Sequence, residues 1–144
     1  MKVGEIMTRG VKIASPDDTI QQAASRMAEL DVGVLPVGEN DRLVGMLTDR
    51  DIAIRAVAQG RGPDTKVREA MTPEVRYCFE DEDLDDVVQN MGENKVRRLP
   101  VMSRDKRLVG IVSFGDVALY GDSQQADTAA TAVSEPGGSH TQSS

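Results

Sequence analysis

The chain repeats itself, and this repeat constrains its fold more than any other feature. The stretch VGEIMT at Val3–Thr8 returns as VREAMT at Val67–Thr72, an offset of 64 residues. The longer block DRLVGMLTDRD, which begins at Asp41, returns as KRLVGIVSFGD, which begins at Lys106. Blocks that recur in the same order with nearly constant spacing indicate two copies of one structural unit of about 60 residues.

Each copy predicts the same order of elements, β-α-β-β-α, after a short helical turn. Apolar residues at helical spacing mark the helices, and apolar runs joined by a polar turn mark the strand pairs. In the first copy, the predicted elements are a helical turn over 3–7, a strand over 11–14, a helix from about 16, strands over 33–37 and 43–47, and a helix after Asp51. In the second copy, they are a turn over 67–71, a strand over 75–79, a helix from about 82, strands over 96–102 and 108–112, and a helix after Asp116. The predicted fold class is α+β, with helices packed on small sheets.

The predicted domains follow the chain in order. The first repeat covers residues 1–60, a linker covers 61–66, the second repeat covers 67–121, and a tail covers 122–144. Glycine and proline in the linker stretch QGRGPDT break regular structure. The tail holds Ser, Thr, Gln, Gly and Ala but almost no large apolar residue. It is predicted to be disordered, because it cannot bury enough surface to offset the entropy lost on ordering.

Composition argues against several classes of function. With Cys78 as the single cysteine and His140 as the single histidine, the sequence predicts no intrachain disulfide, no Cys/His zinc site and no histidine-based catalytic triad. The net charge of −7 and the 3% of aromatic residues disfavour nucleic-acid binding by phosphate neutralisation or base stacking. The apolar runs are shorter than a membrane span, and the first residues lack the apolar run of a secretory signal. We therefore predict a cytoplasmic protein with no catalytic residue, no metal, and no nucleic-acid or membrane partner.

The long repeated block ends in Thr48-x-x-Asp51 in the first copy and in Ser113-x-x-Asp116 in the second. This pattern is the signature of a capping box, in which the two side chains satisfy free N–H groups at a helix start. A binding role is equally open. A carboxylate can accept hydrogen bonds from both hydroxyls of a ribose, and a hydroxyl side chain can bond to ribose or phosphate.

Two glycines occupy the same position of the repeated block, Gly45 in the first copy and Gly110 in the second. Both lie inside predicted strands, where a glycine often marks a place that another chain segment or a ligand approaches closely. We expect one of these two neighbours at each glycine.

The pattern of IMT, helix, LPV, turn, RLVG and S/T-x-x-D resembles the CBS domain, and two copies in tandem resemble a CBS pair, or Bateman module. The resemblance covers about residues 3–120 and is to the stand-alone tandem-CBS signal-transduction proteins of bacteria. It implies two repeats related by pseudo-two-fold symmetry and packed sheet to sheet. It also implies adenosine-containing ligands in the clefts between the repeats (AMP, ADP, ATP or NAD, with S-adenosylmethionine a lesser alternative) and a homodimer.

Three groups of residues are candidates for contacting such a ligand. Asp51 and Asp116 are expected to hold the ribose, with Thr48 and Ser113 beside them. The walls of an adenine slot are expected from Val11, Ile13, Leu35 and Pro36 in the first copy and from Val75, Tyr77, Leu99 and Pro100 in the second, although alternating apolar strand residues also form ordinary core. Arg97 and Arg98 in the second copy and Arg50 in the first are expected to meet phosphate. Since Gly33 and Val34 replace the arginine pair in the first copy, the alternatives are two unequal sites or one ligand whose phosphate draws on arginines of both copies.

The predicted function is a non-enzymatic sensor of adenosine nucleotides, reporting energy or redox state to a regulated partner protein. The alternative is a ligand-free interaction or oligomerisation module, in which both S/T-x-x-D pairs serve only as helix caps. An enzyme is disfavoured because the sequence offers carboxylates but no assembled nucleophile or histidine base.

Overall fold

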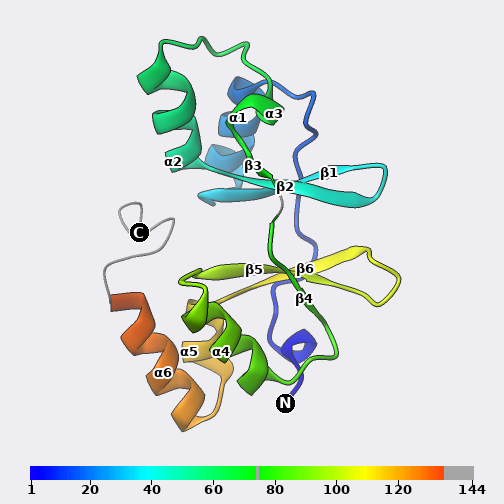
Figure 1. Cartoon of the computed structure of the whole chain (residues 1–144), viewed down its shortest axis with the longest axis vertical. Helices are drawn as coiled ribbons and strands as arrows, with labels where there is room; N and C mark the ends of the chain where they lie inside the picture. The colour runs from blue at the N-terminus through cyan, green and yellow to red at the C-terminus, as the bar shows by residue number, and fades with distance from the viewer. Residues whose placement is uncertain (74, 135–144) are drawn as a thin grey trace. The chain divides into compact units, whose positions relative to one another are not determined.

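The computed structural model describes residues 1–73 and 75–134, and Figure 1 traces its elements. The chain divides into two compact units. The first-repeat unit is residues 12–75, and the second-repeat unit joins residues 1–11 to the chain from Arg76 onward. Each unit has its own three-stranded sheet and its own hydrophobic core.

The first-repeat unit has the sheet order β1-β2-β3. Its elements are α1 (Ile20–Leu30), β1 (Val34–Glu39), β2 (Arg42–Thr48), α2 (Asp49–Asp51), the π-helical turn η2 (Ile52–Ala56), the 3-10 turn η3 (Val57–Gln59), α3 (Val67–Ala70) and β3 (Thr72–Pro73). β2 lies between β1 and β3 and is antiparallel to both. Upstream of α1, Ala14 forms a single parallel bridge to Val37 of β1.

The second-repeat unit has the sheet order β4-β5-β6. Its elements are the 3-10 turn η1 (Val3–Glu5), β4 (Cys78–Phe79), α4 (Leu84–Glu93), β5 (Arg98–Met102), β6 (Leu108–Ser113), α5 (Phe114–Tyr120) and α6 (Ser123–Ser134). β4 is parallel to β5, and β5 is antiparallel to β6.

The two strand pairs and the two amphipathic helices expected from the sequence are confirmed. α1 begins at Ile20, later than expected, because Thr19 caps it by accepting a hydrogen bond from the Gln22 N–H. The strands predicted over 11–14 and 75–79 are shorter than expected. The first is reduced to the single bridge of Ala14, and the second to β4. Both helices bury one face, with Ile20, Ala23 and Met27 of α1 and Leu84, Val87, Val88 and Met91 of α4 in the two cores.

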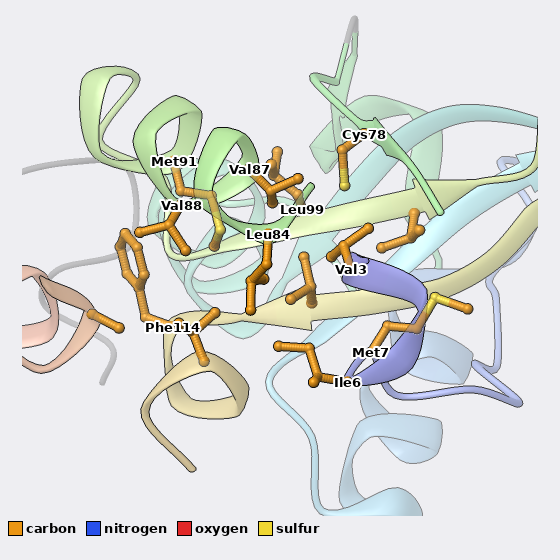
Figure 2. Packing of buried hydrophobic residues seen from close by; sticks show 14 residues of the cluster. Val3, Ile6, Met7, Cys78, Leu84, Val87, Val88, Met91, Leu99 and Phe114 are labelled. Carbon is orange, nitrogen blue, oxygen red and sulfur yellow. The ribbon is translucent and has the colours of Figure 1, made fainter. Parts of the chain in front are cut away.

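Each unit contains the leading segment of the other repeat. Residues 3–8 pack with the second-repeat sheet, where Thr8 and Ile111 exchange two backbone hydrogen bonds, of 2.8 and 3.0 Å. Figure 2 shows three residues of this segment, Val3, Ile6 and Met7, in the same buried cluster as α4 and β5. Residues 67–73 join the first-repeat sheet in the same way through β3, which pairs with Gly45 and Met46 of β2.

The two strand glycines explain how these leading segments fit. A Cβ on Gly110 would lie 2.7 Å from both the Met7 Sδ and the Thr8 carbonyl oxygen. A Cβ on Gly45 would lie 2.7 Å from the Met71 Sδ and 2.8 Å from the Thr72 carbonyl oxygen. Contacts this short do not occur, so any side chain at these two positions would push the leading segment off the sheet. The expected close approach is confirmed, and the neighbour is a chain segment in both units.

The structure differs from the disorder expected after Gly121, because Ser123–Ser134 form helix α6. Asp122 and Gln125 satisfy one another's backbone N–H groups at the start of α6, at 3.0 and 2.9 Å. Ala129 is fully buried in the core that includes Val88 and Phe114. The segment needs few large apolar residues of its own, since the apolar surface that it covers belongs to α4 and α5. Residues 135–144 of the predicted tail lie outside the described residues.

Cys78 is a core residue of β4, only 2% exposed. Burial, together with the nearby charge of Glu82, raises the pKa of its thiol to about 12. We expect native protein at pH 8 to react with a thiol reagent such as DTNB at least ~100-fold more slowly than protein unfolded in guanidinium, where the thiol pKa returns to about 8.5. Equal rates in the two conditions would show that the thiol is accessible in the native state.

Candidate functional site

The strand-to-helix corner of the first-repeat unit is closed by Thr48 and Asp51. The Thr48 Oγ1 accepts a hydrogen bond from the Asp51 N–H at 3.0 Å, and the Asp51 Oδ2 accepts one from the Thr48 N–H at 3.0 Å. Both residues are buried, at 3% and 8% exposure. The capping box predicted from the sequence is therefore confirmed here, and it engages one of the two carboxylate oxygens.

The second-repeat unit has the same corner at Ser113 and Asp116. The Ser113 Oγ accepts from the Asp116 N–H at 3.1 Å, and the Asp116 Oδ2 accepts from the Ser113 N–H at 3.0 Å. These two residues are only half-buried, in contrast to their first-repeat counterparts. Asp116 as a residue is thus more exposed than Asp51.

Strand register brings the other predicted residues of the second repeat to this corner. Arg98 begins β5 directly opposite Ser113, the last residue of β6. The carbonyl of Arg97 accepts the N–H of Phe114, the first residue of α5, at 3.0 Å. Tyr77 immediately precedes β4, where Cys78 pairs in parallel with Val101, so Tyr77 enters the sheet beside Pro100. At about 3.3 Å per residue, this position is about 7 Å along the strand from Arg98.

The first-repeat unit repeats this register with different side chains. Val34 lies opposite Thr48, and Ile13 enters beside Pro36 through the bridge of Ala14 to Val37. The carbonyl of Gly33 accepts the N–H of Asp49 at 3.0 Å, as that of Arg97 accepts the N–H of Phe114. The first repeat therefore has a glycine and a carboxylate where the second has an arginine and a phenylalanine.

The charges around the two corners differ accordingly. In the first repeat, the Asp51 Oδ1 lies 3.9 Å from the Arg55 Nε, one helical turn on, and Arg55 also donates to the Met71 carbonyl at 3.0 Å. Arg50 is half-buried, and its backbone N–H donates to the Asp49 carboxylate at 2.8 Å. In the second repeat, Tyr120 takes the place of Arg55, so the corner carboxylate has no arginine one helical turn on.

The predicted adenine-slot residues fall into two groups. Leu35, Pro36, Leu99 and Pro100 are buried, and the two leucines belong to the hydrophobic cores. Ile13 and Tyr77 are 41% and 40% exposed, and Val11 and Val75 are half-buried where the chain passes from one unit to the other. Ile13 and Tyr77 are therefore the apolar candidates that present the most surface to a ligand.

Sequence reasoning missed Arg55, which lies beside the Asp51 carboxylate. The signal was present, because an Asp followed four residues later by an Arg on a helix is a common ion pair. It also missed Asp81 and Arg104, which are joined by a bidentate contact, with the Arg104 Nε 3.0 and 2.9 Å from the two carboxylate oxygens. Their separation in the sequence gave no such signal.

The profile of the CBS domain matches residues 3–57 and 67–122, which is most of the chain. The chain belongs to the CBS domain family. Its two repeats are a tandem pair of CBS domains, and the corners described above recur once in each domain. The expected recognition and fold class are confirmed.

Relatives of this CBS pair include small CBS proteins. CBS domain-containing protein YhcV of Bacillus subtilis is 46% identical over 117 residues, covering 81% of this chain and 83% of YhcV. Hypoxic Response Protein I, solved with two coordinated zinc ions, is 39% identical with a TM-score of 0.75, over 83% of this chain and 98% of that one. Within residues 1–73 and 75–134, no group of three or more His, Cys, Asp or Glu side chains is placed to hold a metal ion.

Two similar structures hold adenosine compounds. CBSX2, solved in complex with AMP, is 28% identical with a TM-score of 0.71, over 82% of this chain and 93% of that one. The CBS domain pair of MJ0100, solved with 5′-methylthioadenosine and S-adenosyl-L-methionine, is 31% identical with a TM-score of 0.74, over 84% of this chain and 96% of that one. In the part of this chain that the structure describes, no helix is long and apolar enough to cross a membrane.

Proposed function

We propose that this CBS pair is a non-catalytic regulatory module that binds an adenosine nucleotide. The observation that carries the proposal is the second-repeat corner, where Ser113, Asp116 and Arg98 meet at one edge of the sheet. The complexes of CBSX2 with AMP and of MJ0100 with S-adenosyl-L-methionine support the class of ligand. AMP, ADP, ATP and NAD are the candidate ligands, and S-adenosylmethionine remains a lesser one.

Each group at the corner has a distinct role in this proposal. The capping box uses the Oδ2 of Asp116, so the other carboxylate oxygen and the remaining lone pairs can accept hydrogen bonds from the two ribose hydroxyls. The guanidinium of the exposed Arg98 binds phosphate, because a charged donor makes the stronger hydrogen bond to an anion. Tyr77 and Pro100 offer apolar surface to the base.

The first repeat is the weaker phosphate site in this proposal. Asp49 and Asp51 place two carboxylates at its corner, where the second repeat has Asp116 alone and two preceding arginines. Arg55 lies against Asp51 and so opposes the use of that carboxylate by a ribose. We infer two unequal sites, with the second repeat binding nucleotide more tightly.

Regulation requires that the ligand bind two states of the protein with different affinity. We propose that this protein is a cytoplasmic homodimer and that nucleotide binding changes how it acts on a partner protein. The ligand-free module is the second candidate, and the reciprocal capping boxes favour it, because they give Thr48, Asp51, Ser113 and Asp116 a purely structural use.

The charge difference between the repeats gives a direct test with Arg98→Ala and Arg50→Ala. We expect Arg98→Ala to weaken AMP binding about 10-fold, the effect of losing one charge-assisted hydrogen bond. Adenosine, which has no phosphate, should bind this variant as it binds the unmodified protein. Arg50→Ala should change AMP affinity by less than about threefold, because Arg50 lies at the weaker site. Isothermal titration measures all of these affinities. Unchanged AMP affinity in both variants would contradict the assignment of Arg98 as the residue that binds the phosphate.

A further inference from the structure

Helix α6 covers one face of the second-repeat unit, where it lies against α5 and α4 (Figure 1). The profile of the CBS domain ends at residue 122, so α6 is an addition to the second CBS domain of this chain. Ala129 of α6 is buried in the cluster that contains Val88 and Phe114, which lie on the side of the cluster that faces α6 (Figure 2). The Gln125 amide donates a hydrogen bond to the Asp85 carboxylate at 2.5 Å. α6 therefore makes one apolar and one polar contact with the domain.

The surface beneath α6 differs from the same face of the first repeat. Ala24 and Asp49 stand at the positions of Val88 and Phe114, and both are exposed. Val88 and Phe114 are only 5% and 3% exposed. The added helix and the two large apolar residues that it helps to cover therefore occur together, in the repeat that carries Arg98.

Phe114 also belongs to the nucleotide corner. It lies between Ser113 and Asp116, and its N–H donates to the Arg97 carbonyl at 3.0 Å. The reciprocal hydrogen bonds of Ser113 and Asp116, at 3.1 and 3.0 Å, fix the turn of backbone that carries Phe114. The backbone that places the carboxylate for a ribose therefore also places the ring that α6 covers.

Few contacts hold α6 in place. Of its side chains that the structure describes, those of Gln125 and Ala129 are buried, and an alanine buries little apolar surface. A helix of 12 residues is not stable by itself in water, so α6 loses its helical structure when it leaves the domain. Only residues 121 and 122 separate it from α5, so it stays tethered and can return. α6 is thus an element of low local stability, and such elements respond to ligands.

We propose that α6 is a regulatory helix whose docking is favoured by nucleotide binding at the second-repeat corner. A nucleotide bound to Asp116 and Arg98 stabilises the first turn of α5, which presents the Phe114 ring to α6. Release of α6 exposes that ring to water and loosens the same turn. The inference rests on the proposed function and deepens it, because it identifies the element that changes state with the nucleotide. Since coupling between two sites is reciprocal, docked α6 also tightens nucleotide binding.

Amide hydrogen exchange measures the docking of α6, because its amides exchange when the helix is released. They should exchange faster than the amides of α4, which shows that release is local. We expect saturating AMP to slow exchange over residues 127–134 about fivefold, at the low end of the usual range of couplings. In Asp116→Asn, at an AMP concentration that leaves the weakened site empty, exchange over these residues should keep its ligand-free rate.

A substitution on α6 measures the coupling from the other side. Ala129→Glu places a charge at a fully buried position and so disfavours the docked helix. It should weaken AMP binding about fivefold, because linkage requires the same factor in both directions. Thr128→Glu is the matched control, since it adds the same charge to the same helix at an exposed position, and it should bind AMP as the unmodified protein does.

Asp85→Ala is a milder variant, and it decides the question if Ala129→Glu does not fold. It removes the acceptor of the Gln125 amide and leaves the apolar contact of α6 in place. We expect it to weaken AMP binding about twofold. Asp86→Ala is its control, because Asp86 is an exposed carboxylate in the same first turn of α4, and it should leave AMP affinity unchanged.

The outcomes distinguish this inference from the proposed function. AMP binding that depends on Asp116, with α6 exchange that AMP leaves unchanged or makes faster, would overturn the coupling and leave the proposed function standing. Equal AMP affinity in Ala129→Glu and Thr128→Glu would overturn the coupling in the same way, since the reciprocal effect would be missing. No AMP binding by the unmodified protein would overturn both.

Discussion

We expect Gly110→Ala to lower the free energy of unfolding by about 2–4 kcal/mol, through overpacking and the loss of hydrogen bonds. The added Cβ would lie 2.7 Å from the Thr8 carbonyl oxygen and from the Met7 Sδ. Relieving this contact moves residues 7 and 8 away from β6 and breaks the two hydrogen bonds between Thr8 and Ile111. Urea denaturation followed by circular dichroism measures the change.

Gly92→Ala is the matched control for this substitution. Gly92 lies within α4, and a Cβ there would have no heavy atom within 4 Å other than its chain neighbours and the backbone of its own helix. Alanine is the better helix former by about 0.8–1.0 kcal/mol, so this variant should be as stable as the unmodified protein or slightly more so. If Gly110→Ala unfolds at the same urea concentration as Gly92→Ala, the leading segment of the chain does not pack against β6 as the structure has it.

Asp116→Asn should weaken AMP binding about 10- to 100-fold, which corresponds to the 1.5–3 kcal/mol of a hydrogen bond to a charged group. Asparagine keeps an oxygen that can accept the Ser113 N–H, so the capping box survives. It loses the negative charge, and its NH2 group can no longer accept from a ribose hydroxyl. We therefore expect a large loss of affinity and a change in the free energy of unfolding of less than about 1 kcal/mol. Isothermal titration and thermal unfolding on the same sample measure the two effects.

Asp122→Asn separates the binding role of Asp116 from its capping role. Asp122 caps α6 through the same kind of reciprocal pair, with Gln125, in the same unit and away from the corner. It should change stability as little as Asp116→Asn does and leave AMP affinity unaltered. If both variants lose stability equally and both bind AMP normally, Asp116 is a cap and nothing more.

The sequence predicted the local structure of each repeat well, because periodicity and capping are local properties. The spacing of apolar residues located α4, and the S/T-x-x-D pattern located both strand-to-helix corners. The π-helical turn η2 after Asp51 was not predicted, since no residue type marks a shift from α to π hydrogen bonding.

What the sequence did not predict depends on contacts between distant segments. Residues 3–8 belong to the first repeat in the sequence but pack with the second-repeat unit, and the sequence alone indicated only that Gly110 has a close neighbour. Helix α6 was missed for a related reason, because the large apolar side chains that it covers, Val88 and Phe114, lie in other elements. The contact of the Arg104 guanidinium with the Phe79 ring was also missed, since these two residues meet only through the pairing of β4 with β5.

Of the predicted site residues, those chosen for polar chemistry were brought together most clearly. Arg98, Ser113 and Asp116 share one edge of the sheet because strand register fixes where each strand ends. Apolar candidates were harder to predict, because a buried core leucine and a ligand-facing one obey the same alternation. Leu35 and Leu99 turned out to be core residues, whereas Ile13 and Tyr77 remain accessible.

Isothermal titration of the unmodified protein with AMP tests the central claim most directly. The protein should be freed of any co-purified ligand by unfolding and refolding before the titration. The proposal predicts saturable heat with one tight site in each chain, together with a raised melting temperature in the presence of AMP, because a ligand that binds only the native state stabilises it. The absence of both heat and melting shift with AMP, ADP, ATP, NAD and S-adenosylmethionine would contradict the proposal and leave the ligand-free interaction module.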